Sequence, residues 1–194
     1  MKQMLDLTKY FTNQMFLNDE IYDEVMDKNE FPEYLGVDFC TFRYARRAFA
    51  LMTKTPFEIK YMTEKTSSFE KDVIRCDGQN IQVPPNKHTK ISFLGGCVWD
   101  YFCEYVILHY EDGTEERKQI FLYSFSEPNA KDYVEFALNN CPCKDCKDVL
   151  SVLNRDMVGL TVYQFDLCVQ SAEKISSITL PENDNMCIFA ITLE

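Results

Sequence analysis

Hydrophobic and polar residues alternate with a period of two in several short stretches of this chain. The pattern is clearest in 103–110 and 115–122, two runs joined by the segment Glu111-Asp-Gly-Thr114. Because successive side chains of a strand point to opposite faces, such alternation predicts strands that bury one face. Asp-Gly between two of these runs predicts a tight hairpin, since glycine readily adopts the positive φ that the turn requires.

The same alternation recurs between turn-forming residues and predicts further strands. These stretches are 57–61, 79–83, 89–93, 161–169, 175–180 and 186–193. Pro84 and Pro85 follow 79–83, and we expect them to end that strand because proline has no amide hydrogen to donate. The strand at 103–110 is apolar on both faces, so we expect it to be central in its sheet. About eight short strands predict an antiparallel β-sandwich or barrel.

Three stretches lack the alternation. Residues 18–50 have irregular apolar spacing, so we expect mostly loop there, with one strand or helical turn near 42–51. Residues 63–71 are polar and predict a surface loop, whereas 126–156 form an insertion with a short helix at 129–138. No repeat or linker divides the chain, so we expect a single all-β domain over 1–194, with one or two short helices in its loops.

Charge narrows the classes of partner. The chain has 194 residues and a net charge of -11, with 31 acidic residues against 20 Lys and Arg. A surface for nucleic acid or anionic membrane needs clustered basic residues, so we expect neither partner. No segment approaches the ~20 apolar residues of a membrane helix, and the N-terminal residues lack the apolar core of a secretory signal. The 9 cysteines are therefore expected to be reduced thiols in the cytoplasm.

Six motifs occur in an order that resembles a known family. They resemble jelly-roll β-sandwich modules with a galactose-binding-like fold, which in bacteria often accompany glycoside hydrolases and other carbohydrate-active enzymes. The resemblance implies a jelly-roll sandwich and a carbohydrate-binding module without catalytic activity. The motifs are Asp6-Leu-Thr-Lys-Tyr-Phe11, Thr55-Pro-Phe57, Asp77-Gly-Gln-Asn-Ile-Gln-Val-Pro84, Ile91-Ser-Phe-Leu-Gly-Gly96, Tyr110-Glu-Asp-Gly-Thr114 and residues 175–193.

One aromatic cluster suits a sugar ligand. Trp99, Asp100 and Tyr101 follow a Gly-Gly pair in a predicted loop, and Trp99 is the only tryptophan of the chain. An exposed aromatic ring stacks on the apolar face of a pyranose, and a nearby carboxylate accepts hydrogen bonds from its hydroxyls. We therefore predict that Trp99 and Tyr101 stack on a sugar and that Asp100 binds a hydroxyl. The alternative is an aromatic plug that closes one end of the sandwich.

A cysteine cluster lies in the predicted insertion. Cys141, Cys143 and Cys146 place three thiols within six positions, a spacing that suits a structural Zn²⁺. A closed site needs a fourth ligand from elsewhere in the chain, and His88, Cys97 and Cys168 are the candidates. Two alternatives stay open: a redox pair made by Cys143 and Cys146, and three reduced thiols without a ligand.

A second candidate ligand site is a basic cluster. Arg43, Arg46 and Arg47 stand together in an otherwise acidic chain and would hold a carboxylate or a phosphate. The alternative is surface pairing with neighbouring acids. His109 lies on a predicted strand among apolar residues, where a hydrogen-bonded structural imidazole is the favoured interpretation.

These observations lead to one leading function and two alternatives. We expect a non-catalytic, carbohydrate-binding-like module that recognises its ligand by aromatic stacking in the end loops. The first alternative is a structural β-sandwich that assembles as a homodimer through protein–protein contacts. The second is a glycan-acting hydrolase, although the sequence holds neither a nucleophile elbow nor a Gly-rich phosphate loop.

Overall fold

Most of the alternating stretches form strands in the computed structural model. The structure describes residues 3–17, 37–43, 71–98, 101–125, 146–153, 159–170 and 173–194. These residues contain strands β1 to β12 and one short 3₁₀ helix, η1 (Thr8–Tyr10). In the part of the chain that is described, no helix has the length and apolar character needed to span a bilayer.

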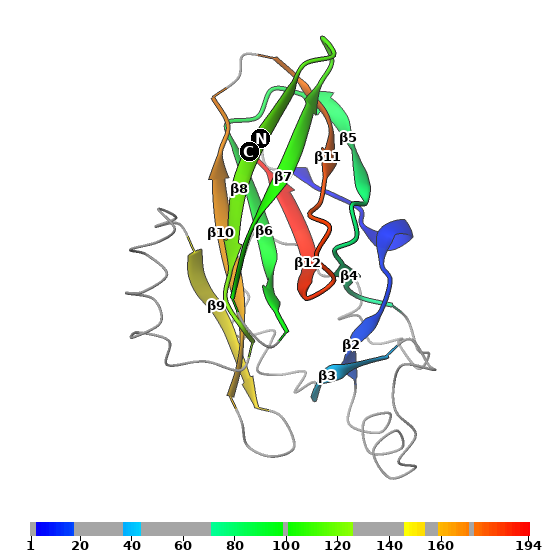
Figure 1. Cartoon of the computed structure of the whole chain (residues 1–194), viewed down its shortest axis with the longest axis vertical. Coiled ribbons are helices and arrows are strands. Elements are labelled where there is room, and N and C mark those ends of the chain that lie inside the picture. The colour runs from blue at the N-terminus through cyan, green and yellow to red at the C-terminus, as the bar shows by residue number, and fades with distance from the viewer. Residues whose placement is uncertain are drawn as a thin grey trace.

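A six-stranded antiparallel sheet forms one layer of the molecule (Figure 1). At its centre Phe93 lies opposite both Ile191 and Phe165, so three apolar side chains line up across three strands. The order runs β1 (Gln3–Met4), β12 (Met186–Leu193), β6 (Lys90–Cys97), β10 (Gly159–Cys168) and β9 (Cys146–Leu153), with β4 (Ile74–Arg75) also paired to β12.

A four-stranded antiparallel sheet forms the second layer. Its order is β5 (Asn80–Asn86), β11 (Ile175–Thr179), β7 (Phe102–Tyr110) and β8 (Glu115–Leu122). The predicted hairpin is confirmed, because β7 and β8 pair from His109 opposite Glu115 onward and Gly113 has a φ of 85°. The central position predicted for β7 is confirmed as well. A separate parallel pair joins β2 (Gln14–Leu17) and β3 (Val37–Arg43).

The two sheets pack face to face around one apolar core. Ile81 of the four-stranded sheet shares this core with Phe93, Phe165 and Ile191 of the six-stranded sheet, and each of the four side chains is at most 2% exposed. Burying apolar surface between two sheets is the main stabilising contribution in such a sandwich. The all-β, antiparallel sandwich predicted by the alternation is thereby confirmed.

The chain that follows β8 crosses from one sheet to the other. Cys97 of β6 donates its amide to the Tyr123 carbonyl at 2.8 Å and accepts the Phe125 amide at 2.9 Å. The ring of Phe125 lies over Gly96, where an added Cβ would be 2.2 Å from a ring carbon. Glycine is therefore required at 96 because an aromatic ring occupies the space that a side chain would take.

Some strand boundaries differ from the prediction. The expected end at Pro84 is wrong, since β5 continues to Asn86. β5 is an edge strand, and its pairing with β11 skips from Gln82 to Asn86, so the two prolines lie at an irregularity that needs no amide donor. β9 lies in the stretch assigned to an insertion. The predicted strand at 57–61 and helix at 129–138 lie outside the described residues.

Candidate functional site

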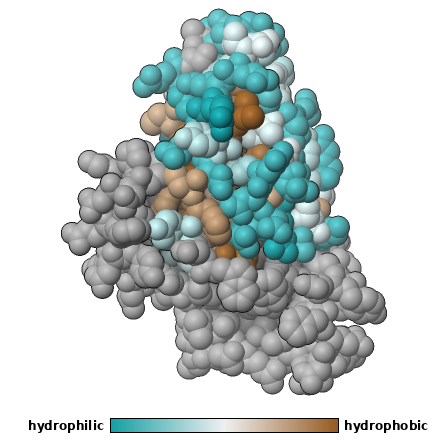
Figure 2. Space-filling model, in the orientation of Figure 1, coloured by the Kyte–Doolittle hydropathy of each residue, from teal (hydrophilic) through white to brown (hydrophobic). Residues whose placement is uncertain are grey.

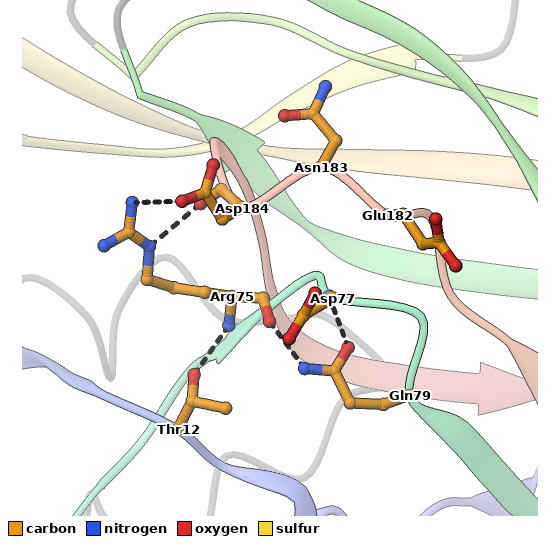
Figure 3. Close-up of a pocket in the computed structure, with 7 residues that line it drawn as sticks. All are labelled: Thr12, Arg75, Asp77, Gln79, Glu182, Asn183 and Asp184. Carbon is orange, nitrogen blue, oxygen red and sulfur yellow. Dashed lines mark hydrogen bonds and ion pairs between the residues drawn. The ribbon is translucent and has the colours of Figure 1, made fainter.

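A polar pocket of about 510 Å³ lies at one end of the sandwich (Figure 3). Two connections form it: the turn from β4 into β5 and the loop from β11 into β12. These connections are more than a hundred positions apart in the sequence, and sheet pairing brings them together. The lining residues are Thr12, Arg75, Asp77, Gln79, Glu182, Asn183 and Asp184.

Arg75 ties the two sides of the pocket together. Its Nε donates to the carbonyl oxygen of Asp184 at 2.9 Å, and one terminal nitrogen lies 3.8 Å from the Asp184 carboxylate. Its main-chain amide donates to Thr12 Oγ1 at 2.8 Å. Figure 3 shows the guanidinium turned toward Asp184, so the arginine is held by this loop rather than left open to a ligand.

The turn from β4 into β5 is held by its own side chains. Gly78 has a φ of 68°, a conformation that glycine adopts without strain, and its amide donates to the Pro181 carbonyl at 3.0 Å. Gln79 spans the turn, because its Oε1 accepts the Asp77 amide at 2.8 Å and its Nε2 donates to the Arg75 carbonyl at 2.7 Å. The backbone on this side of the pocket is therefore fixed by hydrogen bonds.

The loop from β11 into β12 is fixed in the same way by Asn183. Its Oδ1 accepts the Asn185 amide at 3.1 Å, an Asx turn, and its carbonyl accepts the Met186 amide at 2.9 Å. Its Nδ2 donates to Glu104 of β7 at 3.1 Å, which anchors the loop to the second sheet. Both sides of the pocket are thus pre-organised, which lowers the entropic cost of binding a ligand.

The groups left to meet a ligand are mainly carboxylates. The side-chain amides of Gln79 and Asn183 are used in holding the backbone. Asp77 and Glu182 are exposed, and within the described chain no hydrogen bond or ion pair engages either carboxylate. Ionised carboxylates only accept hydrogen bonds, so this pocket suits a ligand that donates them.

The predicted aromatic site is only partly described. Tyr101 is half-buried against the core, with its ring 5.6 Å from the ring of Phe121, whereas Trp99 and Asp100 lie outside the described residues. The loop that carries them begins at Val98, whose amide donates to the Asn185 carbonyl at 2.9 Å. Stacking by Trp99 stays a prediction, and its loop starts against the one that lines the pocket.

The other predicted sites fall largely outside the described residues. Arg43 ends β3 and Cys146 begins β9, but Arg46, Cys141 and Cys143 are not described. Within the described ranges, no three His, Cys, Asp or Glu side chains are arranged to hold a metal ion. No disulfide joins the described cysteines at 76, 97, 103, 168 and 187. Burial raises the pKa of the Cys76 thiol far above its ordinary value, so this group is protonated and unreactive.

The pocket was not predicted from the sequence, although each of the two segments that form it contains turn-forming residues. Residues 77–79 and 181–185 are rich in turn formers, and both segments belong to motifs of the resemblance described above. Neither turn indicates a site alone. Their convergence depends on β12 pairing with β4 on one side and β6 on the other, which sequence spacing does not show.

The comparisons with known proteins add no family. No model of a known protein family matches the chain, and a search of curated proteins finds no match. A function for the chain is therefore argued from its sequence patterns and from the geometry of the pocket.

Proposed function

We propose that this protein is a carbohydrate-binding-like module with a galactose-binding-like jelly-roll fold, non-catalytic toward the sugar that it binds. The order of the strands supports the jelly roll: β4, β12, β6 and β10 follow one another in one sheet, and β5, β11, β7 and β8 in the other. Strands that are consecutive in the chain thus alternate repeatedly between the sheets, as two interlocked Greek keys require.

The observation that carries the binding proposal is the pre-organised pocket with two unengaged carboxylates. Sugar hydroxyls are donors of suitable size, and Asp77 and Glu182 would accept hydrogen bonds from them. Trp99 would supply the stacking surface together with Tyr101, and Asp100 would bind a hydroxyl; Val98, which precedes them in the chain, is hydrogen-bonded to Asn185 of the loop that lines the pocket. A small open site of this kind supports affinities on the order of micromolar to millimolar.

The charge of the pocket favours neutral sugars over acidic ones. Its lining has one basic residue, Arg75, and three acidic residues, and Asp184 already engages the guanidinium. A uronic acid would bring a further negative charge next to Asp77 and Glu182 and would be repelled. Neutral hexoses and their oligomers are therefore the proposed ligand class.

Calorimetric titration with a panel of sugars tests this proposal. We expect the wild type to bind at least one neutral oligosaccharide saturably and to bind oligogalacturonate more weakly. Binding should be lost in Trp99→Ala and in the double variant Asp77→Asn with Glu182→Gln. Glu111→Gln is the matched control, since this acid lies in the hairpin turn beyond β7 and pairs with Lys174. The absence of saturable binding to every member of the panel would remove the proposal.

A homodimer is the second candidate, and the free edge at β8 favours it. Among the described strands, β8 ends the four-stranded sheet, and it carries no proline, unlike the opposite edge strand β5. Pairing of two β8 strands would satisfy their outward backbone groups. Light scattering tests this candidate by measuring the molar mass in solution. The mass of a monomer at all protein concentrations would exclude the dimer.

We propose that the protein works in the reducing cytoplasm. The lack of a disulfide among the described cysteines at 76, 97, 103, 168 and 187 supports this proposal.

A further inference from the structure

A row of polar side chains crosses the outer face of the four-stranded sheet, separate from the residues that line the pocket. Each strand contributes one residue: Glu115 from β8, His109 from β7, Thr179 from β11 and Asn80 from β5. Glu115 lies directly opposite His109, and Asn80 directly opposite Thr179. The residues that alternate with them, such as Leu108 and Ile178, face the core, so the row faces outward.

The distances make this row a continuous hydrogen-bond chain. His109 Nδ1 lies 2.9 Å from Glu115 Oε1, and His109 Nε2 lies 2.8 Å from Thr179 Oγ1. The Asn80 side-chain amide donates to Thr179 Oγ1 at 3.0 Å. A carboxylate only accepts hydrogen bonds, so in the neutral imidazole Nδ1 carries the proton and Nε2 presents its lone pair. The Thr179 hydroxyl then donates its proton to Nε2.

We propose that Thr179 is a nucleophile activated by His109, with Glu115 as the positioning residue, and that it accepts acyl or phosphonyl groups from activated esters. An acid, an imidazole and a hydroxyl in this order form the arrangement that activates hydroxyl nucleophiles on unrelated folds, and geometry rather than sequence position identifies it. The His109 side chain is 25% exposed, so a reagent in solution reaches it.

The proposed step balances without a further reactant. Thr179 Oγ1 attacks the carbonyl carbon of an ester while His109 Nε2 takes the hydroxyl proton, and Glu115 stabilises the resulting imidazolium. The bond to the leaving oxygen then breaks, and Nε2–H returns the proton to that oxygen. The products are an acyl-threonine and an alcohol, and attack of water on the acyl-threonine by the same route releases the acid.

Two neighbouring side chains indicate the class of ester. Ile107 lies directly opposite Thr179, and Tyr105 follows on the same outward face of β7. Tyr105 is 45% exposed, one of two large hydrophobic side chains so exposed among the described residues. Ile107 and the part of Tyr105 left exposed beside Arg117, whose guanidinium stacks on the ring, would bind the acyl part, so the inferred substrates are esters of short apolar acids.

Labelling with a biotin-tagged fluorophosphonate tests the inference. In this reaction the Thr179 oxygen bonds to phosphorus, fluoride leaves, and His109 takes the proton. We expect the label to map to Thr179 by peptide mass analysis and to be lost in Thr179→Val. Removal of the base in His109→Gln should slow labelling by about 10² to 10⁴. Thr179→Ser retains a hydroxyl and should still be labelled.

The controls separate activation from simple accessibility. Thr114→Val is the matched control, because the Thr114 hydroxyl donates to the Asp112 carboxylate at 2.6 Å without any imidazole, and its loss should leave the label unchanged. Glu115→Asp should preserve more labelling than Glu115→Ala, since it keeps a carboxylate for Nδ1. An unlabelled wild type, or a label that survives in Thr179→Val or His109→Gln, would overturn the inference. Sugar binding is a separate measurement and does not bear on this result.

Discussion

The central strands of the two sheets are built differently. In the six-stranded sheet, every residue of β12 is buried, as is every residue of β6 except the first. In the four-stranded sheet, β7 buries one face through Val106 and Leu108, while Tyr105 and His109 on the other face contact solvent. The central strands of the six-stranded sheet are therefore buried on both faces, whereas β7 of the four-stranded sheet packs one face on the shared core and presents the other to solvent. Figure 2 shows a mainly hydrophilic surface over much of the described part of the molecule.

The difference indicates which parts of the molecule have side chains available to bind a ligand. Strands buried on both faces leave no side chain for a ligand, and their residues are constrained by packing at crystal-like density. The outer face of the four-stranded sheet and the loops at the sandwich end carry the hydrogen-bonding groups. Both candidate sites, the pocket with Asp77 and Glu182 and the row with His109 and Thr179, lie in this second group.

The largest expected contrast comes from removing one ring from each sheet. Phe93→Ala empties a fully buried position in β6 and should lower the free energy of unfolding by about 3–5 kcal/mol. Tyr105→Ala removes an exposed ring that only stacks on Arg117, whose guanidinium lies 4.5 Å from the ring centroid, and should cost ~1 kcal/mol or less. Urea denaturation measures both. Equal losses would contradict the contrast between the sheets.

Two glycine substitutions sharpen the comparison. A Cβ at Gly95 would lie 2.2 Å from the Cys187 carbonyl oxygen on β12, so Gly95→Ala forces two paired backbones apart and should cost about 3 kcal/mol. Gly113 has open space around it, so Gly113→Ala in the hairpin should cost only about 1 kcal/mol, for its positive φ. The melting temperatures of the two variants show which substitution destabilises the protein more. A smaller loss of stability in Gly95→Ala than in Gly113→Ala would show that the paired backbones of β6 and β12 separate at little cost.

The smallest expected effect concerns His88, in the connection between β5 and β6, which joins the two sheets. The side chain is 3% exposed, and burial lowers its pKa below the ordinary 6.5. The folded protein therefore binds fewer protons here than the unfolded chain, so this contribution to stability is complete above pH 6.5 and is lost as the pH falls toward the lowered pKa. Comparing denaturation at about pH 7.5 and 5.5, we expect wild type to lose more stability than His88→Gln. Identical losses in the two proteins would show that His88 does not titrate differently on folding.

Much of the strand content follows from alternation, and its failures have identifiable causes. The runs at 79–83, 89–93, 103–110, 115–122, 161–169, 175–180 and 186–193 all coincide with strands to within one residue at an end. β1 and β4 have two residues each, too short for any period to show. β9 was not predicted, because the stretch that contains it was assigned to an insertion around the cysteine cluster. β5 continued through two prolines because an edge strand with a pairing irregularity needs no donor there.

The candidate sites were harder to predict from the sequence than the strands were. The site at Trp99 was predicted from residue type and stays a prediction, because of its three residues the structure describes only Tyr101, packed against Phe121. Arg75 and Asp184 carried no signal, because a single Arg and a single Asp far apart in the sequence are common in an acidic chain. His109 was noticed as a histidine on a strand, but its partners Glu115 and Thr179 come from two different neighbouring strands.

The sequence by itself determined the class of fold and the hairpin, because a period of two and an Asp-Gly turn are local properties of consecutive residues. Tertiary structure alone decided which strands are buried on both faces and which turns meet at the pocket. It also decided which side chains form a row across the sheet. These are distances between residues far apart in the chain, and they are set by strand order and register, which local alternation does not encode.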